Sequence, residues 1–526
     1  MEGGKRKVER GKRMENNQIY NQGEPMGQMM PPQRPMPIWQ RMTKGAGKVQ
    51  NIFPKWLSQY SIAVYLLALA AISMIYSAYS LPWYYLLSGI VAVTVFFLYG
   101  SKAVQDTSLV RIKKEKSFEK KLLIIALVPR IAFMLLLYWI FQENYGNAFG
   151  FESNDASFYD DLGNDFANAL RENTFAELFS KTSKTVELDD MGYAIYVGFI
   201  YWMTGNSIIA VRLIKCLLSA ITVLLIYRMA KRNFGEQTGR MAAIFVALWP
   251  NFWYYCAVHL KETEMVFLAV LFVEQAEQML RSRQFTAWKV IPILLIAASL
   301  FTLRTPLALI ALLSLVFSLV MSSSKVVSWG KRIAIGGMAI LLIALTMGNR
   351  ISEEASGLVD TVQSNEQQYN MSWRSKREHG NSFAKYAGAT VFAPMIFTIP
   401  FPTMVRPYDG QDEQQIVNGG NFVKNIMSGF SILAMFTLLL SGKWREHLLP
   451  LSFLLGYLVV LTMSTFAQSE RFHQPAMPFE LMFMAYGLSI AVTKKKYKRW
   501  FTYWCVLMFV ACIAWNWFKL AGRGLT

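Results

Sequence analysis

The sequence predicts an all-α, polytopic integral membrane protein with about 13 transmembrane helices. Of its 526 residues, 54% are hydrophobic and only 17% are charged, whereas soluble domains carry about 25% charged residues. The apolar residues gather in blocks whose lengths suit helices that cross the hydrocarbon core. Basic residues collect between the blocks, as they do in cytoplasmic loops. A large soluble helical protein is disfavoured, because its helices would need polar faces that these blocks lack.

The N-terminal part of the chain, residues 1–55, differs from the rest. It is polar and basic, and it is rich in Pro, Gln and Met, a composition that cannot form a packed core. We interpret it as a disordered cytoplasmic tail. A cleavable signal peptide is not expected, because no apolar stretch follows the charges closely. Residues 56–121 then supply two additional N-terminal transmembrane helices and a cytoplasmic loop.

The apolar blocks continue to the end of the chain, where residues 494–526 supply a C-terminal transmembrane helix. Two stretches are less regular, since 192–205 is short and 388–404 is broken by three prolines. We expect both to lie in the outer interface or to re-enter, although the sequence leaves open whether they cross. The clearest blocks are 61–80, 81–100, 122–141, 208–230, 241–258, 306–321, 333–347 and 448–465.

The distribution of charge predicts the orientation of these helices. The segments "RMAKRNFG", "RSRQFTAWK", "SKVVSWGKR", "GKWREH" and "TKKKYKRW" all fall on one side if the helices alternate. Because Lys and Arg are enriched in cytoplasmic loops, we place this side and the N-terminus in the cytoplasm. Residues 142–190, with eleven acidic and three basic residues, then lie outside, as do residues 349–425. These are the only large outer segments, and we expect function between them.

The first outer loop contains a candidate catalytic pair. In "FESNDASFYDDLGNDFANAL" (151–170), Asp155 and Tyr159 are four residues apart and therefore share one face of a helix. A carboxylate at this boundary could take a proton from an acceptor hydroxyl. The alternative is a solvated acidic loop in which Asp155 caps the following helix. Asp160 and Asp161 are secondary candidates, and with Asp155 they could bind a divalent cation, although no ligand spacing requires it.

Other ionisable side chains fall at the same outer level in the predicted topology. Ionisable groups near or inside a bilayer are costly and often mark functional sites. The cations among them suit a phosphate on a lipid carrier, although such residues can also anchor helix ends by snorkelling. The set comprises Arg212, His259, Lys261, Glu262, Arg304, Glu470, Arg471 and His473.

Several motifs, in this order, resemble those of a known family. "NDASFYDDLGNDFANAL" resembles an Asp-Ala-x-x-Tyr-x-x-Leu-Ala pattern of GT-C glycosyltransferases. It is followed by "GYAIYVGFIYWMTGNSIIAVRLIKCLLSAITVLLIYRMAKRNFG", "LWPNFWYYCAVHLKET" and "ERFHQPAMPFELMFMAYGL". This order is similar to the branch of protein O-mannosyltransferases and lipid A aminoarabinose transferases. The resemblance covers residues 122–493, which we expect to form the catalytic core.

The resemblance implies an enzyme that moves a sugar from a polyprenyl-phosphate carrier to an extracytoplasmic acceptor, which could be protein, lipid or glycan. It implies that Asp155 is the base, with Tyr159 beside it. Arg304 and Arg471 match arginines that meet the carrier's phosphate, and Glu262 matches an acidic position of the family.

Further site roles follow from position. We expect Lys261 and Arg212 to add positive charge at the donor phosphate. The expected secondary or substrate-binding residues are Asp160, Asp161, His259, Glu262, Glu470 and His473.

The sequence also departs from the family pattern. Asn154 precedes Asp155 where the mannosyltransferases have paired acids, and Phe472 follows Arg471 where the family usually has Tyr. These differences leave the donor sugar and the acceptor open. We expect an integral protein of a bacterial plasma membrane, with the active site outside the cytoplasm.

No nucleotide-binding signature is present, since the sequence has neither a Walker A loop nor a Gly-rich dinucleotide turn. We therefore expect no nucleic-acid partner and no certain cofactor. Two rival functions remain. An O-antigen polymerase or ligase also has about a dozen helices and a large outer loop, but usually late in the chain. A transporter or flippase of lipid-linked substrates usually shows internal repeats, and none is visible here.

Overall fold

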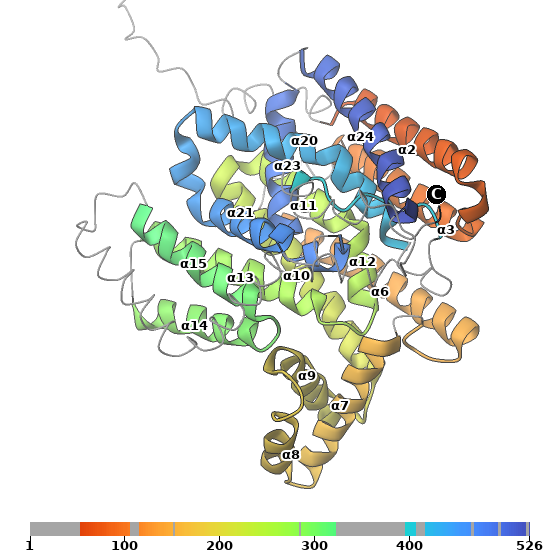
Figure 1. The fold of residues 1–526 in the computed structure, drawn as a ribbon. Helices are drawn as coiled ribbons and strands as arrows, with labels where there is room; N and C mark the ends of the chain where they lie inside the picture. Colours follow the sequence, from red (N-terminus) through yellow and green to blue (C-terminus); the bar gives the residue numbers. More distant parts are fainter. Residues whose placement is uncertain are drawn as a thin grey trace, which may run out of the picture. The chain divides into compact units, whose positions relative to one another are not determined.

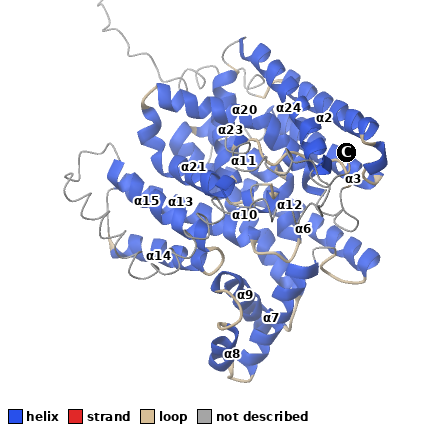
Figure 2. Ribbon diagram, viewed as in Figure 1, coloured by secondary structure: helices blue, strands red, loops and turns tan. Residues whose placement is uncertain are grey.

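The computed structural model describes residues 53–105, 115–150, 153–282, 286–321, 395–406, 416–463, 468–492, 496–521 and 525. The predicted tail up to residue 52, the predicted block 333–347 and most of the outer loop 349–425 lie outside the described residues. Within the described ranges the regular structure is helical (Figure 2), apart from one isolated bridge between Ser80 and Val405. The all-α class is confirmed for these residues.

Several described helices are long and apolar enough to cross a membrane. Seven segments meet this condition: Lys55–Ile75, Trp83–Val104, Phe118–Tyr145, Ile208–Phe234, Asn418–Leu440, Lys443–Thr462 and Tyr497–Ala521. Shorter apolar helices are α14 (Ala287–Phe301), α15 (Thr305–Met321) and α23 (Met477–Ala491). These helices confirm a polytopic membrane protein, while the number of about 13 crossings stays a prediction.

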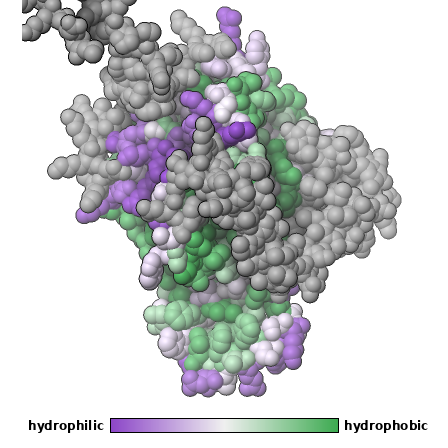
Figure 3. Space-filling model, turned by 90° about the vertical axis from the view of Figure 1, so that its left-hand side faces the viewer, coloured by the Kyte–Doolittle hydropathy of each residue, from purple (hydrophilic) through white to green (hydrophobic). Residues whose placement is uncertain are grey.

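Large apolar side chains lie exposed along these helices, for example Leu67, Trp139 and Leu295, each at least 60% exposed. Hydrophobic residues also cover much of the described surface in Figure 3. Such surface would be unfavourable in water, but it suits helices that face lipid.

Helix α10 (Ile208–Phe234) is central to the packing (Figure 1), because it contacts α6 (Glu115–Tyr145), α11 (Glu236–Leu248) and α13 (Glu262–Ser282). A second layer follows: α23 packs on both α11 and α20 (Asn418–Leu440). The predicted N-terminal addition is helical as well. Its first helix, α2 (Lys55–Ile75), packs on α24 (Lys496–Ala521), and α3 (Trp83–Thr94) packs on α20.

The predicted block 241–258 is two helices. Helix α11 ends at Leu248, and α12 (Pro250–Ala257) begins after one intervening residue, Trp249. Proline has no N–H to continue a helical ladder, but it suits the first position of a new helix. After α12 the chain turns through residues 258–261 and starts α13 at Glu262. This turn positions Lys261 and Glu262.

The first outer loop is mostly helical, with α7 (Ser153–Arg171), α8 (Phe175–Thr182) and α9 (Leu188–Thr204). The apolar stretch 192–205 is thus largely part of α9, which lies beside α7 (Figure 1). Glycine allows their close approach. A Cβ at Gly198 would lie 2.6 Å from the Phe166 Cβ and 2.9 Å from the Gly163 carbonyl oxygen.

Of the proline-broken stretch 388–404, residues 395–404 are described. Here Ile399 and Phe401 are fully buried, and the backbone is mainly non-helical. Side-chain amides replace the missing helical hydrogen bonds: Asn425 donates to the Pro400 carbonyl at 3.2 Å, and Asn516 donates to that of Pro402 at 3.1 Å. Irregular backbone is tolerated at membrane depth only when it is satisfied in this way.

Candidate active site

Arg471 joins two acidic residues from distant parts of the chain. It lies on the short helix α22 (Glu470–His473), and its Nη1 is 2.5 Å from the Asp155 Oδ2 in the first turn of α7. Its Nε donates to the Oε1 of Glu262, the first residue of α13. Burial would lower the pKa of Arg471, but the carboxylates of Glu262 and Asp155 raise it well above its usual value. The guanidinium therefore stays cationic.

A second polar group lies beside the first and centres on Asp190. The Tyr159 hydroxyl donates to the Asp190 Oδ1 at 2.8 Å, and the Lys261 Nζ donates to the same oxygen at 2.6 Å. Burial would raise the pKa of Asp190, but the charge and hydrogen bond of Lys261 hold it below its usual value. Burial and the Asp190 carboxylate raise the pKa of Tyr159, so the phenol stays protonated.

The two groups form one site, because on both α7 and α13 a residue of the first group lies close to a residue of the second. Asp155 and Tyr159 are one turn apart on α7, and Lys261 and Glu262 are neighbours at the start of α13. Asp155 is joined to Glu262 through Arg471, and Tyr159 is joined to Lys261 through Asp190. The predicted shared face of the Asp-x-x-x-Tyr pair thus faces the start of α13.

Arg304 lies next to the segment that carries Arg471. It immediately precedes α15, and its guanidinium lies 4.0 Å from the centre of the Phe472 ring. The Arg471 guanidinium is 6.0 Å from the same ring, so two arginines flank one aromatic side chain. The Phe472 backbone is fixed in turn, because its carbonyl accepts a 2.8 Å hydrogen bond from the Tyr457 hydroxyl. The structure therefore places both predicted phosphate-binding arginines near each other.

Arg212 and Asp160 lie on the side of the site toward α9. Asp160 accepts hydrogen bonds from the Tyr201 hydroxyl and from Asn164, and burial raises its pKa. Arg212 is fully buried and donates to the Ala148 carbonyl at 2.5 Å. Both make structural contacts, and Arg212 is less accessible to a donor than Arg471.

His259 is fully buried and lies against the rings of Phe149, Tyr193 and Tyr201. Burial lowers its pKa well below the usual value, and the charges of neighbouring basic residues lower it further. The imidazole is therefore neutral, which disfavours a phosphate-binding role.

The remaining predicted residues point elsewhere. Glu470 accepts a 3.1 Å hydrogen bond from the Tyr255 hydroxyl, and burial raises its pKa. The Nδ1 of His473 lies 3.1 Å from the Lys424 Nζ on α20. Asp161 is exposed. Among the described residues no group of three His, Cys, Asp or Glu side chains that could hold a metal ion is found, and a divalent cation at Asp155, Asp160 and Asp161 stays a prediction.

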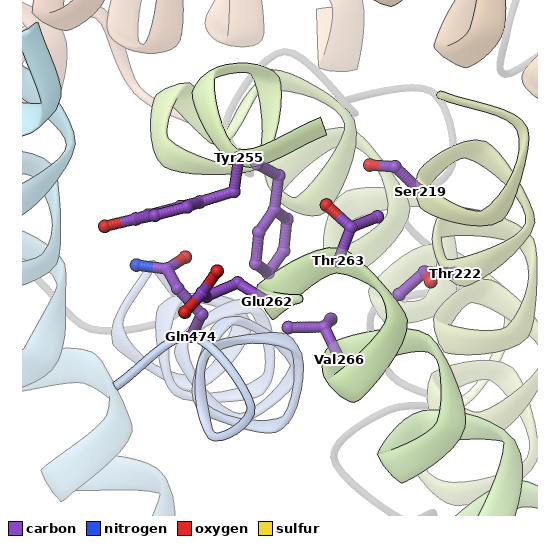
Figure 4. Close-up of a pocket in the computed structure, with 8 residues that line it drawn as sticks. Ser219, Thr222, Tyr255, Glu262, Thr263, Val266 and Gln474 are labelled. Atoms are coloured by element: carbon purple, nitrogen blue, oxygen red, sulfur yellow. The ribbon is translucent and has the colours of Figure 1, made fainter. Parts of the chain in front are cut away.

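A small pocket adjoins the Arg471 group on the side of α13. Its volume of about 10 Å³ is close to the space that a single water molecule needs. Glu262, which is almost completely buried, contributes to its wall. Figure 4 shows the lining side chains, which come from α10, α12, α13 and the segment after α22: Ser219, Thr222, Phe252, Tyr255, Glu262, Thr263, Val266 and Gln474.

Asp190 is the site residue that sequence reasoning missed. It belongs to an acidic pair at the start of an apolar stretch, in "ELDDMGYAIYVGF". Negative residues are common in the first turn of a helix, where they complement its dipole. The sequence pattern therefore could not distinguish a role of Asp190 in the site from that of an acid that only caps the helix.

Residues 192–347 match the dolichyl-phosphate-mannose-protein mannosyltransferase family. The resemblance to GT-C enzymes is therefore confirmed over this region. No curated protein and no solved structure matches the chain.

The mannosyltransferase match indicates a membrane glycosyltransferase. The matched region contains Lys261, Glu262 and Arg304, while Asp155 and Arg471 lie on either side of it. The structure brings residues from inside and outside the match into one site.

Proposed function

We propose that this protein transfers a sugar from a polyprenyl-phosphate donor to an extracytoplasmic acceptor, with Asp155 as the general base. The observation that carries the proposal is the contact of Arg471 with Asp155 and Glu262. It combines a carboxylate that is 54% exposed with a cation held by a buried acid. A proton acceptor and a phosphate-binding cation are the two groups that this transfer needs.

The reaction follows from these two groups. The acceptor oxygen forms a bond to the anomeric carbon while the bond from that carbon to the phosphate oxygen breaks. Asp155 takes the proton of the acceptor hydroxyl, and the polyprenyl phosphate leaves with the electron pair. Fixed cations stabilise the charge that develops on the leaving phosphate, and the proposal assigns this role to Arg471 and Arg304.

The ion pair between Asp155 and Arg471 suggests how the donor prepares the base. A donor phosphate that approaches Arg471 competes with the Asp155 carboxylate for the same N–H groups. Glu262 keeps its own contact from the buried side. Donor binding would thus release Asp155 toward the acceptor while Arg471 stays in place.

Replacing Asp155 tests the proposal. Asp155→Asn keeps the shape of the side chain but cannot take the proton, so the transfer rate should fall by about two to four orders of magnitude. Asp165→Asn, an exposed acid on the same helix, is the matched control and should retain activity. Transfer is measured with a radiolabelled polyprenyl-phosphate sugar, and thermal unfolding of each variant is measured in parallel. Near wild-type transfer by a folded Asp155→Asn variant rejects Asp155 as the base.

An assay that contains the donor but no acceptor distinguishes the rival functions. A glycosyltransferase should slowly hydrolyse a polyprenyl-phosphate sugar without acceptor, whereas a flippase should leave it intact. A polymerase or ligase should instead require a lipid-linked oligosaccharide. Mass analysis of cell-envelope glycans from a deletion strain would then identify the sugar and the acceptor.

A further inference from the structure

Lys215 is a fully buried cation that the proposed reaction does not use. It lies on α10, and its Nζ donates to the Leu260 carbonyl. The same nitrogen is 3.5 Å from the Glu264 Oε2 on α13 and 3.5 Å from the Tyr193 hydroxyl on α9. One ammonium group thus contacts two helices and the turn before α13.

The contacted turn is the one that carries two site residues. Leu260 immediately precedes Lys261 and Glu262. Lys261 reaches Asp190 on one side, whereas Glu262 reaches Arg471 on the other. Residues 258–261 lie between α12 and α13, and a carbonyl in such a turn has no partner from a continuous helical ladder. The direction of the Leu260 carbonyl therefore affects where both side chains point.

The surroundings of Lys215 favour a role in holding this turn. A buried ion pair is weak support for stability, because its desolvation offsets its Coulombic attraction. Glu264 balances the charge of Lys215, but the separation of 3.5 Å is longer than that of a direct hydrogen bond between a cation and a carboxylate. The contact with the Leu260 carbonyl is the closer one.

We propose that Lys215 is a positioning residue: its ammonium group fixes the Leu260 carbonyl and thereby orients Lys261 and Glu262 toward Asp190 and Arg471. This inference rests on the proposed function, because it concerns the geometry of the same site. Lys215 touches none of the reacting groups and acts only through the turn.

Three variants distinguish whether Lys215 positions the turn or only neutralises the charge of Glu264. Lys215→Met removes the ammonium and leaves Glu264 unpaired, so stability and activity should both fall. Glu264→Gln removes the counter-ion but keeps the shape of the side chain, and its kcat should stay within a few-fold of wild type in the folded fraction. The double variant, Lys215→Met with Glu264→Gln, has no buried charge at this pair. Its thermal stability should return toward wild type, while its kcat should stay about 10–100-fold low, as expected for a misplaced catalytic group.

The double variant decides the question. A double variant that regains both stability and kcat would overturn the proposal, because Lys215 would then only neutralise Glu264. Amide hydrogen exchange of residues 258–263 gives a readout that does not depend on activity, and exchange should be faster in the double variant. Unchanged exchange in that variant also overturns the proposal. Asp155→Asn, assayed in parallel, tests the proposed base separately, because it should leave this exchange unchanged.

Discussion

At the scale of single residues, Arg471 makes the two contacts on which the proposed function depends. Its Nη1 contacts an exposed acid and its Nε contacts a buried one, so it can exchange one anionic partner for another without leaving the site. Arg304 approaches the same place from the start of α15 and rests on the Phe472 ring. Planar guanidinium groups suit both tasks, since they bind phosphate oxygens and stack on aromatic faces.

Removal of either arginine should weaken donor binding. A hydrogen bond to a charged group contributes about 1.5–3 kcal/mol, so Arg471→Ala and Arg304→Ala should each raise the donor Kd by about 10–100-fold. Arg445→Ala, an exposed arginine outside the site, is the control and should bind as wild type does. Binding is measured by titration of the purified protein with a non-hydrolysable donor analogue. Wild-type affinity in a folded variant would remove that arginine from the donor site.

The Asp190 group should make stability depend on pH. Because the folded-state pKa of Asp190 is lower than the usual value of about 3.9, its ionised form stabilises the folded state. This contribution is complete above the unfolded-state pKa and is lost as the pH falls through the folded-state pKa. Thermal unfolding between pH 7 and pH 3 should therefore show a smaller acid-induced loss in Asp190→Asn than in wild type. Parallel pH curves for the two proteins would contradict this assignment.

At the scale of elements, the packing of α9 on α7 creates the site. Asp190 is in the first turn of α9 and Tyr159 is on α7, so the contact between them requires both helices in register. Two glycines permit this, because a Cβ at Gly163 or at Gly198 would lie 2.6 Å from a side-chain carbon of the partner helix. On the exposed faces of α7 and α9, a side chain does not meet the partner helix.

A methyl group at Gly198 should disturb this pair of helices. Glycine to alanine within a helix usually gains about 0.5–1 kcal/mol, but here the new Cβ would meet the Phe166 Cβ and the Gly163 carbonyl. Overpacking of this kind costs about 1–3 kcal/mol. Gly198→Ala should therefore lower the melting temperature and the transfer rate, whereas Asp165→Ala on the exposed side of α7 should do neither. Thermal unfolding in detergent measures the effect, and a stabilised Gly198→Ala variant would show that the helices can separate freely.

The sequence predicted these elements better than their contacts. The spacing of four residues placed Asp155 and Tyr159 on one face of α7, because helical periodicity is local. The contact of Asp155 with Arg471 joins positions 316 residues apart, and no local pattern encodes it. The predicted topology placed Asp155 and Arg471 at the same outer boundary of the membrane, but it did not predict that they contact each other. The break before Pro250 was missed, because 241–258 was predicted as one apolar block, although "LWPN" carries the signal: proline favours the first turn of a helix.

At the scale of the whole molecule, three of the loops predicted on the cytoplasmic side lie together, at the ends of α10 and α13 that are remote from the site residues. His447 of "GKWREH" lies 2.6 Å from the Asn233 Oδ1 of "RMAKRNFG" through its Nδ1. Arg281 of "RSRQFTAWK" donates to the same Asn233 oxygen at 2.8 Å. The site residues adjoin the other ends of these two helices, at the start of α13 and near the start of α10. Loops assigned to one side by charge alone are therefore neighbours in space.

This arrangement gives a direct test of orientation. Lys184, between α8 and α9, and Arg445, between α20 and α21 (Leu448–Met463), are both exposed. If Lys and Arg mark the cytoplasmic side, a cysteine at position 184 should react with a membrane-impermeant maleimide in intact cells, and one at position 445 should react only after permeabilisation. The four native cysteines are buried, so background labelling should be low. Labelling of position 445 but not 184 in intact cells would reverse the orientation and move the proposed site, with its donor and acceptor, to the cytoplasmic face.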